Sequence, residues 1–187
     1  MDSFYNEQEL KEIGFKALGK NVLVSKKASI YSPDKITLGN NVRIDDFCIL
    51  SGVISVGDYV HISAHTCVFA GEAGVEIGNF SGLSSRCAVY AISDDYSGSY
   101  LANAMVPDEF RNIVSRKVVI GNCVVIGTGT TILPGVKIAD GAAVGCMSLI
   151  NKTIDIDGIY CGIPVKRIKD RRQDYKKQAE LIKNGNK

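Results

Sequence analysis

The sequence predicts an all-β solenoid in which a short strand and a turn repeat every six residues. Aliphatic residues recur at this period in three runs: Leu38, Ile44, Leu50, Val56, Ile62 and Val68; Ile77, Leu83 and Val89; Ile120, Ile126, Ile132, Ile138, Val144 and Ile150. Small or β-branched residues follow four positions later in the third run, at Val124, Thr130, Val136, Ala142 and Ser148. Helical faces repeat every 3.6 residues and strand faces every 2, so a strict period of six indicates stacked, three-sided coils. The 19 glycines agree with such frequent turns.

The chain order of the other elements follows from local signals. Residues 1–23 are expected to form a short N-terminal helix, ended by Gly14, and a lead-in. The solenoid is expected over residues 24–164, with a two-residue slip near Pro33. Residues 165–187 are rich in Lys and Arg and are expected to form a basic helix that caps or flanks the open end of the solenoid.

Two interruptions of the period are expected to leave the solenoid. Val68 and Ile77 are separated by nine positions instead of six, so three extra residues must bulge out between them. Residues 93–116 are too long and too polar to be another strand, and they lie between two runs in phase, so they are expected to form a protruding loop. Long loops on a rigid scaffold are favoured places for binding and catalysis.

Composition limits the class of protein. With 187 residues, 45% of them hydrophobic, the chain can bury a substantial core in one domain. A net charge of +2 does not indicate a nucleic-acid partner. The six cysteines contain no CxxC pair, and Cys48 and Cys87 occupy small-residue positions of the repeat, so we interpret them as buried hydrophobes. Without a signal segment or about 18 consecutive apolar residues, we expect a soluble, cytoplasmic protein with no membrane partner.

The six-residue register, the interrupting loop and the closing segment GIYCGIPVKRIKDR resemble the hexapeptide-repeat acyltransferases over residues 20–172. The resemblance implies a left-handed parallel β-helix and a homotrimer whose active sites lie between neighbouring subunits, with the protruding loop reaching across. It also implies an acyl-CoA co-substrate, either acetyl-CoA or a longer or hydroxylated acyl-CoA, and no metal requirement.

Cofactor-binding positions follow from the family motifs. The segments IGTGTTILPGV and VGCMSLINK match two coils that line the pantetheine groove, and GIPVKRIK matches the family ending, whose basic residues approach nucleotide phosphates. These matches imply the following cofactor-binding residues: Thr128, Cys146, Asn151, Lys152, Lys166 and Lys169. Lys suits the last two positions because it is a compact phosphate-binding charge. Simple turn packing is the alternative interpretation of Thr128 and Cys146.

The sequence departs from the family at the catalytic base. Sugar O-acetyltransferases of the family have a His directly after the last repeat before the loop, and this chain has Asp94 there. Its two histidines, His61 and His65, lie one or two coils earlier, and His65 could face the groove. An alcohol must lose its proton as it attacks a thioester, which favours a base that titrates near neutrality. An unperturbed Asp lies about 2.6 pKa units below His, a deficit of roughly 3.5 kcal/mol.

An amine nucleophile has a different requirement, because its lone pair attacks directly and its proton leaves afterwards. We therefore expect Asp94 to orient an amine, with His65 as the other catalytic candidate. The segments SGLSSR and SDDYSG resemble the branch of the family that N-acylates nucleotide-linked amino-deoxy sugars, dTDP-linked 4-amino-4,6-dideoxy sugars in particular. The candidate acceptor-binding residues are Ser84, Glu72, Tyr96 and Arg111. A turn residue that begins the loop is the alternative interpretation of Asp94.

Three other functions remain open at this level. An O-acetyltransferase that acts on a saccharide hydroxyl would use His65 or Asp94. A non-enzymatic scaffold is the second alternative, and it would explain neither the cofactor-type ending nor the long loop. A γ-class carbonic anhydrase would need three His ligands for zinc, and the chain contains 2 His. The sequence thus favours N-acylation of a nucleotide-linked amino sugar in surface-polysaccharide or glycan biosynthesis.

Overall fold

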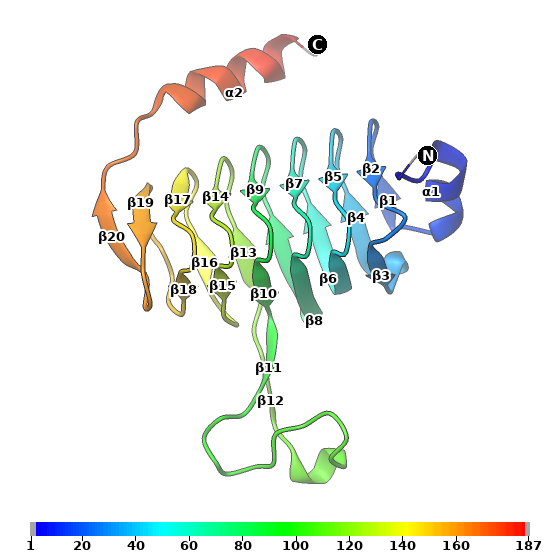
Figure 1. Cartoon of the computed structure of the whole chain (residues 1–187), viewed down its shortest axis with the longest axis vertical. Coiled ribbons are helices and arrows are strands. Elements are labelled where there is room, and N and C mark those ends of the chain that lie inside the picture. The colour runs from blue at the N-terminus through cyan, green and yellow to red at the C-terminus, as the bar shows by residue number, and fades with distance from the viewer. Residues whose placement is uncertain (1–2, 186–187) are drawn as a thin grey trace.

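The chain winds into a long β-helix of three-sided coils in a computed structural model that describes residues 3–185 (Figure 1). The coils are left-handed, and strands of successive coils pair in parallel along three faces. A long loop projects from the side of the solenoid, a short helix precedes the first coil and a longer helix follows the last one (Figure 1). The predicted fold class is therefore confirmed.

We name the three faces A, B and C. Face A comprises β1 (Ala17–Leu18), β4 (Ile36–Leu38), the second halves of β6 (Ile49–Val56) and β8 (Cys67–Ile77), β13 (Val118–Ile120) and β16 (Lys137–Ile138). Face B comprises β3 (Ser29–Tyr31), the first halves of β6 and β8, β10 (Ala88–Tyr90), β15 (Thr131–Ile132) and β18 (Leu149–Ile150). Face C comprises β2 (Leu23–Val24), β5 (Arg43–Ile44), β7 (His61–Ile62), β9 (Gly82–Leu83), β14 (Val125–Ile126), β17 (Ala142–Val144), β19 (Gly158–Cys161) and β20 (Lys166–Lys169).

Helical segments and a ribbon complete the described chain. The helices are α1 (Glu7–Ile13), the 3-10 turns η1 (Pro33–Lys35) and η2 (Asp108–Phe110), and α2 (Asp174–Gly185). The ribbon forms the stem of the loop and pairs β11 (Ile92–Asp94) with β12 (Ile113–Ser115) in antiparallel register. No helix within residues 3–185 has both the length and the apolar content needed to cross a bilayer.

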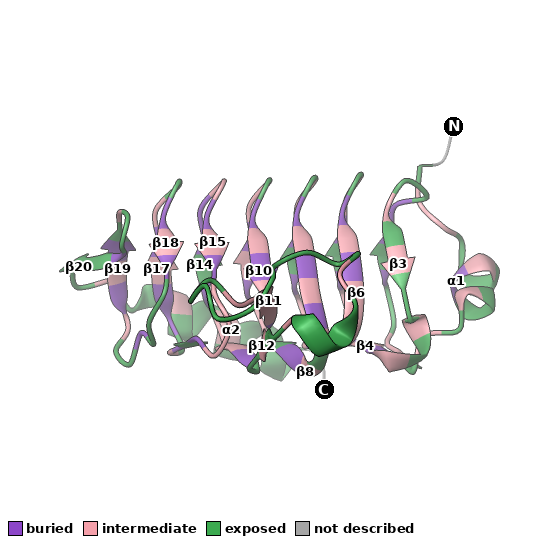
Figure 2. Ribbon diagram, turned by 90° about the horizontal axis from the view of Figure 1, so that it is seen from below, coloured by how far each residue is buried: buried purple, intermediate pink, exposed green. Residues whose placement is uncertain are grey.

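The six-residue series forms the core of the solenoid. Each residue of the unbroken run from Ile120 to Ile150 is at most 3% exposed, and so are the small residues four positions later, from Val124 to Ser148. Figure 2 shows buried residues on the solenoid strands and mostly exposed ones along the protruding loop. Cys48 and Cys87 are buried as predicted. One aliphatic residue per strand therefore stacks on its equivalents in neighbouring coils.

Both predicted interruptions are present. Leu50 pairs with Val68 and Val56 pairs with Ile77, so six positions of β6 correspond to nine of β8. The register shifts occur next to Gly52, where the extra residues bulge. The loop leaves after β10, and its first and last residues form the β11–β12 ribbon, which the polar composition of the segment did not predict. The loop returns to the solenoid at β13.

The predicted N-terminal helix is confirmed, the solenoid begins before residue 24 because β1 already pairs with β4, and the C-terminal prediction is partly wrong. Helix α1 begins at an Asn6–Glu9 capping box and ends at Gly14, whose φ of 81° is left-handed. A helix from residue 165 is incorrect: β20 pairs antiparallel with β19 first, and α2 begins only at Asp174. The physical reason is that β19 ends the parallel stack with an unpaired edge, which β20 covers. Residues 1–2 and 186–187 of the two predicted terminal segments lie outside the described residues.

The corners of the coils form three edges. Edge 1 joins faces A and C, and α2 lies along it, fastened by the Arg171 guanidinium, which donates to the carbonyls of Cys123 at 2.7 Å and Gly141 at 3.0 Å (Figure 1). Edge 2 joins faces C and B, and edge 3 joins faces B and A. The bulge of β8 and the long loop both leave from edge 3. These edges position the candidate site residues.

Candidate active site

The predicted site residues fall on two edges and on the last strand. Edge 2 carries four of them in successive coils: His65, Ser84, Thr128 and Cys146. Edge 3 and its loop carry six: Glu72, Asp94, Tyr96, Arg111, Asn151 and Lys152. Strand β20 carries Lys166 and Lys169. Within one chain, strand β10 separates the Ser84 corner from the loop, and its three residues span roughly 10 Å.

Ser84 is held by the stack while its hydroxyl stays available. It follows β9, its N–H donates to the Ile126 carbonyl at 2.9 Å, and its carbonyl accepts from the Thr66 hydroxyl at 3.0 Å. Within residues 3–185, the Ser84 hydroxyl makes no hydrogen bond. A half-buried hydroxyl on a rigid corner can therefore bind a ligand at little cost in conformational entropy.

Thr128 and Cys146 lie on the next two corners of edge 2. The Thr128 hydroxyl donates to the Ser85 carbonyl at 2.9 Å, and its own carbonyl accepts from the Met147 N–H at 2.7 Å. The Thr128 hydroxyl thus links two coils, as the turn-packing interpretation requires, and its oxygen can still accept a hydrogen bond. The Cys146 side chain is exposed beside it.

The two histidines lie on the opposite side of face B from the loop. His65 is an exposed corner residue of edge 2, with φ 62°, and its ring stacks on Phe47 with centroids 4.9 Å apart. His61 points outward on face C, where its Nε2 lies 2.8 Å from the Asp45 carboxylate. Burial opposes ionisation of Asp45, but hydrogen bonds from Arg43 and His61 outweigh it and lower the pKa of Asp45. Neither imidazole meets Asp94 within one chain.

Asp94 ends β11 at the base of the loop, and Arg111 lies opposite it. The Arg111 Nη2 is 3.8 Å from the Asp94 Oδ1, and the side chains are 15% and 35% exposed, respectively. Arg111 Nη1 donates to the Ala104 carbonyl at 3.4 Å and lies 3.7 Å from the Asp108 carboxylate. Its buried Nε has no hydrogen-bond partner among the described residues. Arg111 therefore joins the stem to the tip of the loop and leaves part of the Asp94 carboxylate accessible.

The other loop candidates are less constrained. Glu72 lies in the bulge of β8 and forms an ion pair with Lys35 of η1. The preceding residue, Gly71, lies against the Ile92 side chain of β11, so the bulge and the loop stem are neighbours. Tyr96 is 90% exposed. Asp95 instead stabilises the start of the loop, since hydrogen bonds from Asn112 and from Ser97 lower its pKa.

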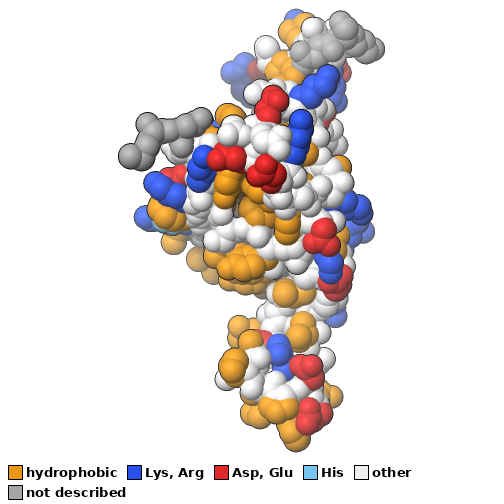
Figure 3. Space-filling view, turned by 90° about the vertical axis from the view of Figure 1, so that its right-hand side faces the viewer, with side chains coloured by type: hydrophobic (Ala, Val, Ile, Leu, Met, Phe, Trp, Pro, Cys, Tyr) orange, Lys and Arg blue, Asp and Glu red, His pale blue; other side chains and the backbone are white. Residues whose placement is uncertain are grey.

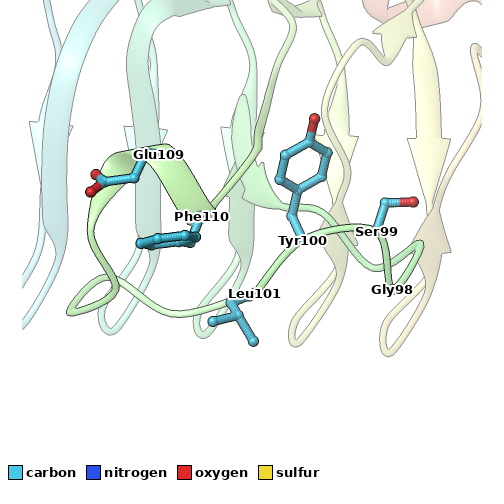
Figure 4. A pocket seen from close by; sticks show the side chains of 6 residues that line it. All are labelled: Gly98, Ser99, Tyr100, Leu101, Glu109 and Phe110. Carbon is cyan, nitrogen blue, oxygen red and sulfur yellow. The ribbon is translucent and has the colours of Figure 1, made fainter.

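Two hollows lie near these groups. One of about 360 Å³ is inside the loop tip, lined by Gly98, Ser99, Tyr100, Leu101, Glu109 and Phe110 (Figure 4). The Tyr100 ring points back toward the solenoid (Figure 4). Another of about 240 Å³ is at the C-terminal end and is lined by nine residues that include Lys152, Lys166 and Arg167. Arg167 was not among the predicted cofactor-binding residues, but it belongs to the same basic run as Lys166 and lines this hollow with it. Asn151 and Lys169 do not line this hollow.

Comparisons with known proteins show which proteins the chain is similar to. No family model matches it. A curated Escherichia coli protein, dTDP-4-amino-4,6-dideoxy-D-glucose acyltransferase, is 42% identical over 182 residues, which cover 96% of this chain and 93% of that protein. The crystal structure of AntD, an N-acyltransferase from Bacillus cereus in complex with dTDP and 3-hydroxybutyryl-CoA, superposes with a TM-score of 0.96 at 47% identity and covers 100% of both chains.

AntD has also been crystallised as variants of its own Ser84 and Asp94. Its S84C variant, in complex with dTDP-4-amino-4,6-dideoxyglucose and coenzyme A, superposes with a TM-score of 0.94 and covers 98% of this chain and 99% of that one at 47% identity. Similarity of this extent, over a fold with the same coils and loop, shows that the chain is an acyltransferase and belongs to the hexapeptide-repeat acyltransferase family.

Proposed function

We propose that this enzyme transfers an acyl group from acyl-CoA to the amino group of a dTDP-linked 4-amino-4,6-dideoxy sugar. The observation that carries the proposal is the loop stem, where a carboxylate, Asp94, stands in place of the family's histidine beside the Arg111 guanidinium. Support comes from the end-to-end similarity to a protein crystallised with dTDP, an amino-deoxy sugar nucleotide and CoA. That protein, AntD, also has a Ser84 and an Asp94, and variants of both have been crystallised.

The proposed chemistry needs a positioned amine and no strong base. The neutral amine attacks the thioester carbon, the carbon–sulfur bond breaks, and coenzyme A leaves as thiolate. The nitrogen then gives up one proton, which the thiolate accepts directly or by way of Asp94 or water, so that an amide and CoA thiol result. Asp94 accepts a hydrogen bond from the amine, the Ser84 hydroxyl contacts the sugar, and Arg111 holds the carboxylate in place.

We assign the coenzyme to edge 2 and the C-terminal hollow. Lys152, Lys166 and Arg167 bring positive charges to that hollow, which suits the phosphates of CoA, and Lys169 and Asn151 lie nearby in sequence. Thr128 and Cys146 lie on edge 2, on the two coils that follow the Ser84 corner toward the C-terminal end. The pantetheine arm would follow that line of corners and deliver the thioester next to Ser84.

A homotrimer would complete the site. Ser84 and Asp94 are on different edges of one chain, so a second copy is needed to bring a loop to edge 2. Apolar side chains gather on the projecting loop (Figure 3), where Tyr96 and Met105 are each 90% exposed. Face B adds an outward apolar row that includes the stacked rings of Phe69 and Tyr90. Both surfaces suit burial against a neighbouring subunit.

We place this enzyme in the cytoplasm. The six cysteines are all free thiols, as expected in a reducing compartment. Tyr96 and Glu72 remain candidates for contacts to the acceptor from the loop and the bulge, where their exposure leaves them accessible.

The test is a free-thiol release assay with acetyl-CoA and longer acyl-CoAs against dTDP-4-amino-4,6-dideoxy sugars, dTDP-glucose and simple glycosides. We expect turnover with the amino sugars, and a rate that rises with pH toward the pKa of the substrate ammonium, because only the neutral amine attacks. Efficient acylation of a glycoside hydroxyl that is lost in His65→Ala and kept in Asp94→Asn would establish the O-acetyltransferase alternative instead.

A further inference from the structure

The tip of the protruding loop contains a hollow to which the proposed chemistry gives no role. Its volume is about 360 Å³, and two segments line it, residues 98–101 on the outgoing side and Glu109 and Phe110 on the returning side (Figure 4). The Leu101 N–H donates to the Phe110 carbonyl at 2.9 Å and joins the two segments. The side chains of Tyr100 and Phe110 are 49% and 57% exposed. Two accessible aromatic rings in one hollow favour a flat, weakly polar ligand.

The charges of this loop-tip hollow distinguish between the parts of a nucleotide sugar. Among its six lining residues Glu109 alone is charged, and within residues 3–185 the Glu109 carboxylate makes no ion pair or hydrogen bond. Because no Lys, Arg or His lines the hollow, the carboxylate would repel phosphate groups placed there. An uncharged base meets no such repulsion. The lining therefore suits the base of a nucleotide and not its phosphates.

Arg111 connects the loop-tip hollow to the proposed acceptor site. It directly follows Phe110, its backbone pairs with that of Leu101, and its guanidinium lies 3.8 Å from the Asp94 carboxylate. The carboxylate, the guanidinium and the hollow thus follow one another along the loop. A nucleotide-linked amino sugar has its groups in the same order, namely the amino sugar, the anionic diphosphate and the base. Arg111 supplies positive charge at the middle position, where the diphosphate would pass.

We propose that the loop-tip hollow binds the pyrimidine base of the acceptor nucleotide, with the base packed against the Phe110 ring. The proposal rests on the proposed function, and the similar protein AntD has been crystallised with dTDP. One loop would then hold the acceptor from the amine at Asp94 to the base at Phe110, while edge 2 holds the donor. The long loop would serve recognition of the nucleotide as well as the reaction.

Titration calorimetry with dTDP, without any acyl-CoA, measures the contribution of the ring. Phe110→Ala should raise the Kd for dTDP by about tenfold to a hundredfold, because the base loses its stacking partner. Phe110→Tyr keeps a ring, and Asn103→Ala changes a loop residue outside the hollow, so both should stay within about threefold of wild type. An unchanged Kd in Phe110→Ala, or no dTDP binding by the wild type, would overturn the proposal.

Photo-crosslinking locates the base directly. In 5-iodo-2′-deoxyuridine 5′-diphosphate an iodine replaces the thymine methyl group, and irradiation couples the base to an aromatic side chain that it contacts. Peptide mass spectrometry should find the cross-link at Tyr100 or Phe110, and excess dTDP should suppress it. Cross-links found only outside residues 98–110 would overturn the proposal.

Two further outcomes separate the base site from its alternatives. If light scattering shows that Phe110→Ala changes the oligomeric state while dTDP affinity is kept, the hollow is a subunit contact and the proposal is wrong. If no amino sugar is acylated, but dTDP binds and depends on Phe110, the base site stands and only the proposed function fails.

Discussion

At the residue scale, the Asp94–Arg111 pair is the feature on which the proposed chemistry depends. Arg111 is largely buried and lies just before β12 in the stem. Its guanidinium contacts Ala104 and Asp108 in the loop tip. A Lys at this place would keep the charge but lose the planar fork that makes several contacts at once. In the proposed mechanism, Arg111 would therefore act on the reaction through the position of Asp94.

A double-mutant cycle tests this coupling. Asp94→Asn should lower kcat by about 10- to 10³-fold, and Arg111→Lys by about tenfold, because the amine loses its orienting group or that group loses its support. The double variant should be no slower than Asp94→Asn within about threefold, since each change removes the same interaction. Independent, multiplying effects would show that Arg111 acts elsewhere. Asp108→Asn removes the other carboxylate beside Arg111 and serves as the control.

Cysteine reactivity should distinguish the buried thiols of the core from Cys146, which lies on the proposed path of the coenzyme. Burial raises the pKa of Cys48 and of Cys87 to about 11, so almost none of either thiol is ionised near neutral pH. Iodoacetamide at pH 8 should label Cys146 and Cys161, which are exposed, well before these two. Saturating acetyl-CoA, which has no free thiol to consume iodoacetamide, should slow labelling of Cys146, and dTDP alone should not. Peptide mass spectrometry measures both rates, and labelling of Cys146 that CoA leaves unchanged would contradict the coenzyme placement.

At the element scale, edge 1 is held by a ladder of side chains. The carboxamide or carboxylate oxygen of each ladder residue accepts the backbone N–H of a residue one coil earlier, at 2.6 to 2.9 Å. The ladder residues are Asn40, Asp58, Asn79, Asn122 and Asp140. Short strands of two or three residues make few backbone hydrogen bonds of their own, so these side chains add directional hydrogen bonds between coils.

Removing one rung should measure this contribution. Asn79→Ala leaves the Asp58 N–H without its 2.7 Å acceptor and should lower the free energy of unfolding by about 1–2 kcal/mol. Urea unfolding followed by circular dichroism gives the value. Asn103→Ala, in the exposed loop, breaks a comparable bond to the Met105 N–H but should change stability by less than about 0.5 kcal/mol. Equal effects of the two variants would rule out a special role for the ladder.

At the scale of the whole molecule, the separation of Ser84 from Asp94 is the observation behind the proposed assembly. Within one chain, edge 2 and the loop stem lie on opposite sides of face B. The proposed site, which uses both residues, would take one from each of two subunits. We therefore expect single variants at either position to be defective through different subunits of the same site.

Subunit mixing tests this arrangement. Ser84→Ala and Asp94→Asn chains, co-expressed with different tags, should form mixed trimers in which one site in three, about a third of the sites, contains both native residues. Doubly tagged trimers should recover activity to about that fraction of wild type, far above either parent. Light scattering checks that the isolated species is a trimer. If Ser84 and Asp94 acted from the same chain, mixing would restore nothing.

The solenoid was predictable from sequence because each coil makes the same contacts. A fixed six-residue period turns Ile126 and Ile132 toward the interior of the solenoid, whichever residues the neighbouring coils contain. Local spacing alone therefore determines the buried face. The same regularity revealed the bulge after Val68 and the loop over residues 93–116 as breaks in phase. Asp94 could be proposed as a site residue from its position at the start of the loop, and Ser84 from its turn one coil earlier, both with the help of the family resemblance.

The sequence by itself therefore determined the repeat, the core and the place of the loop. Only the tertiary structure decided that β20 covers the last coil, that Arg111 faces Asp94 across the stem, and that Ser84 and Asp94 lie on different edges. The physical reason is that these contacts join residues without a common period. Their positions depend on which corners and edges the winding of the chain brings together.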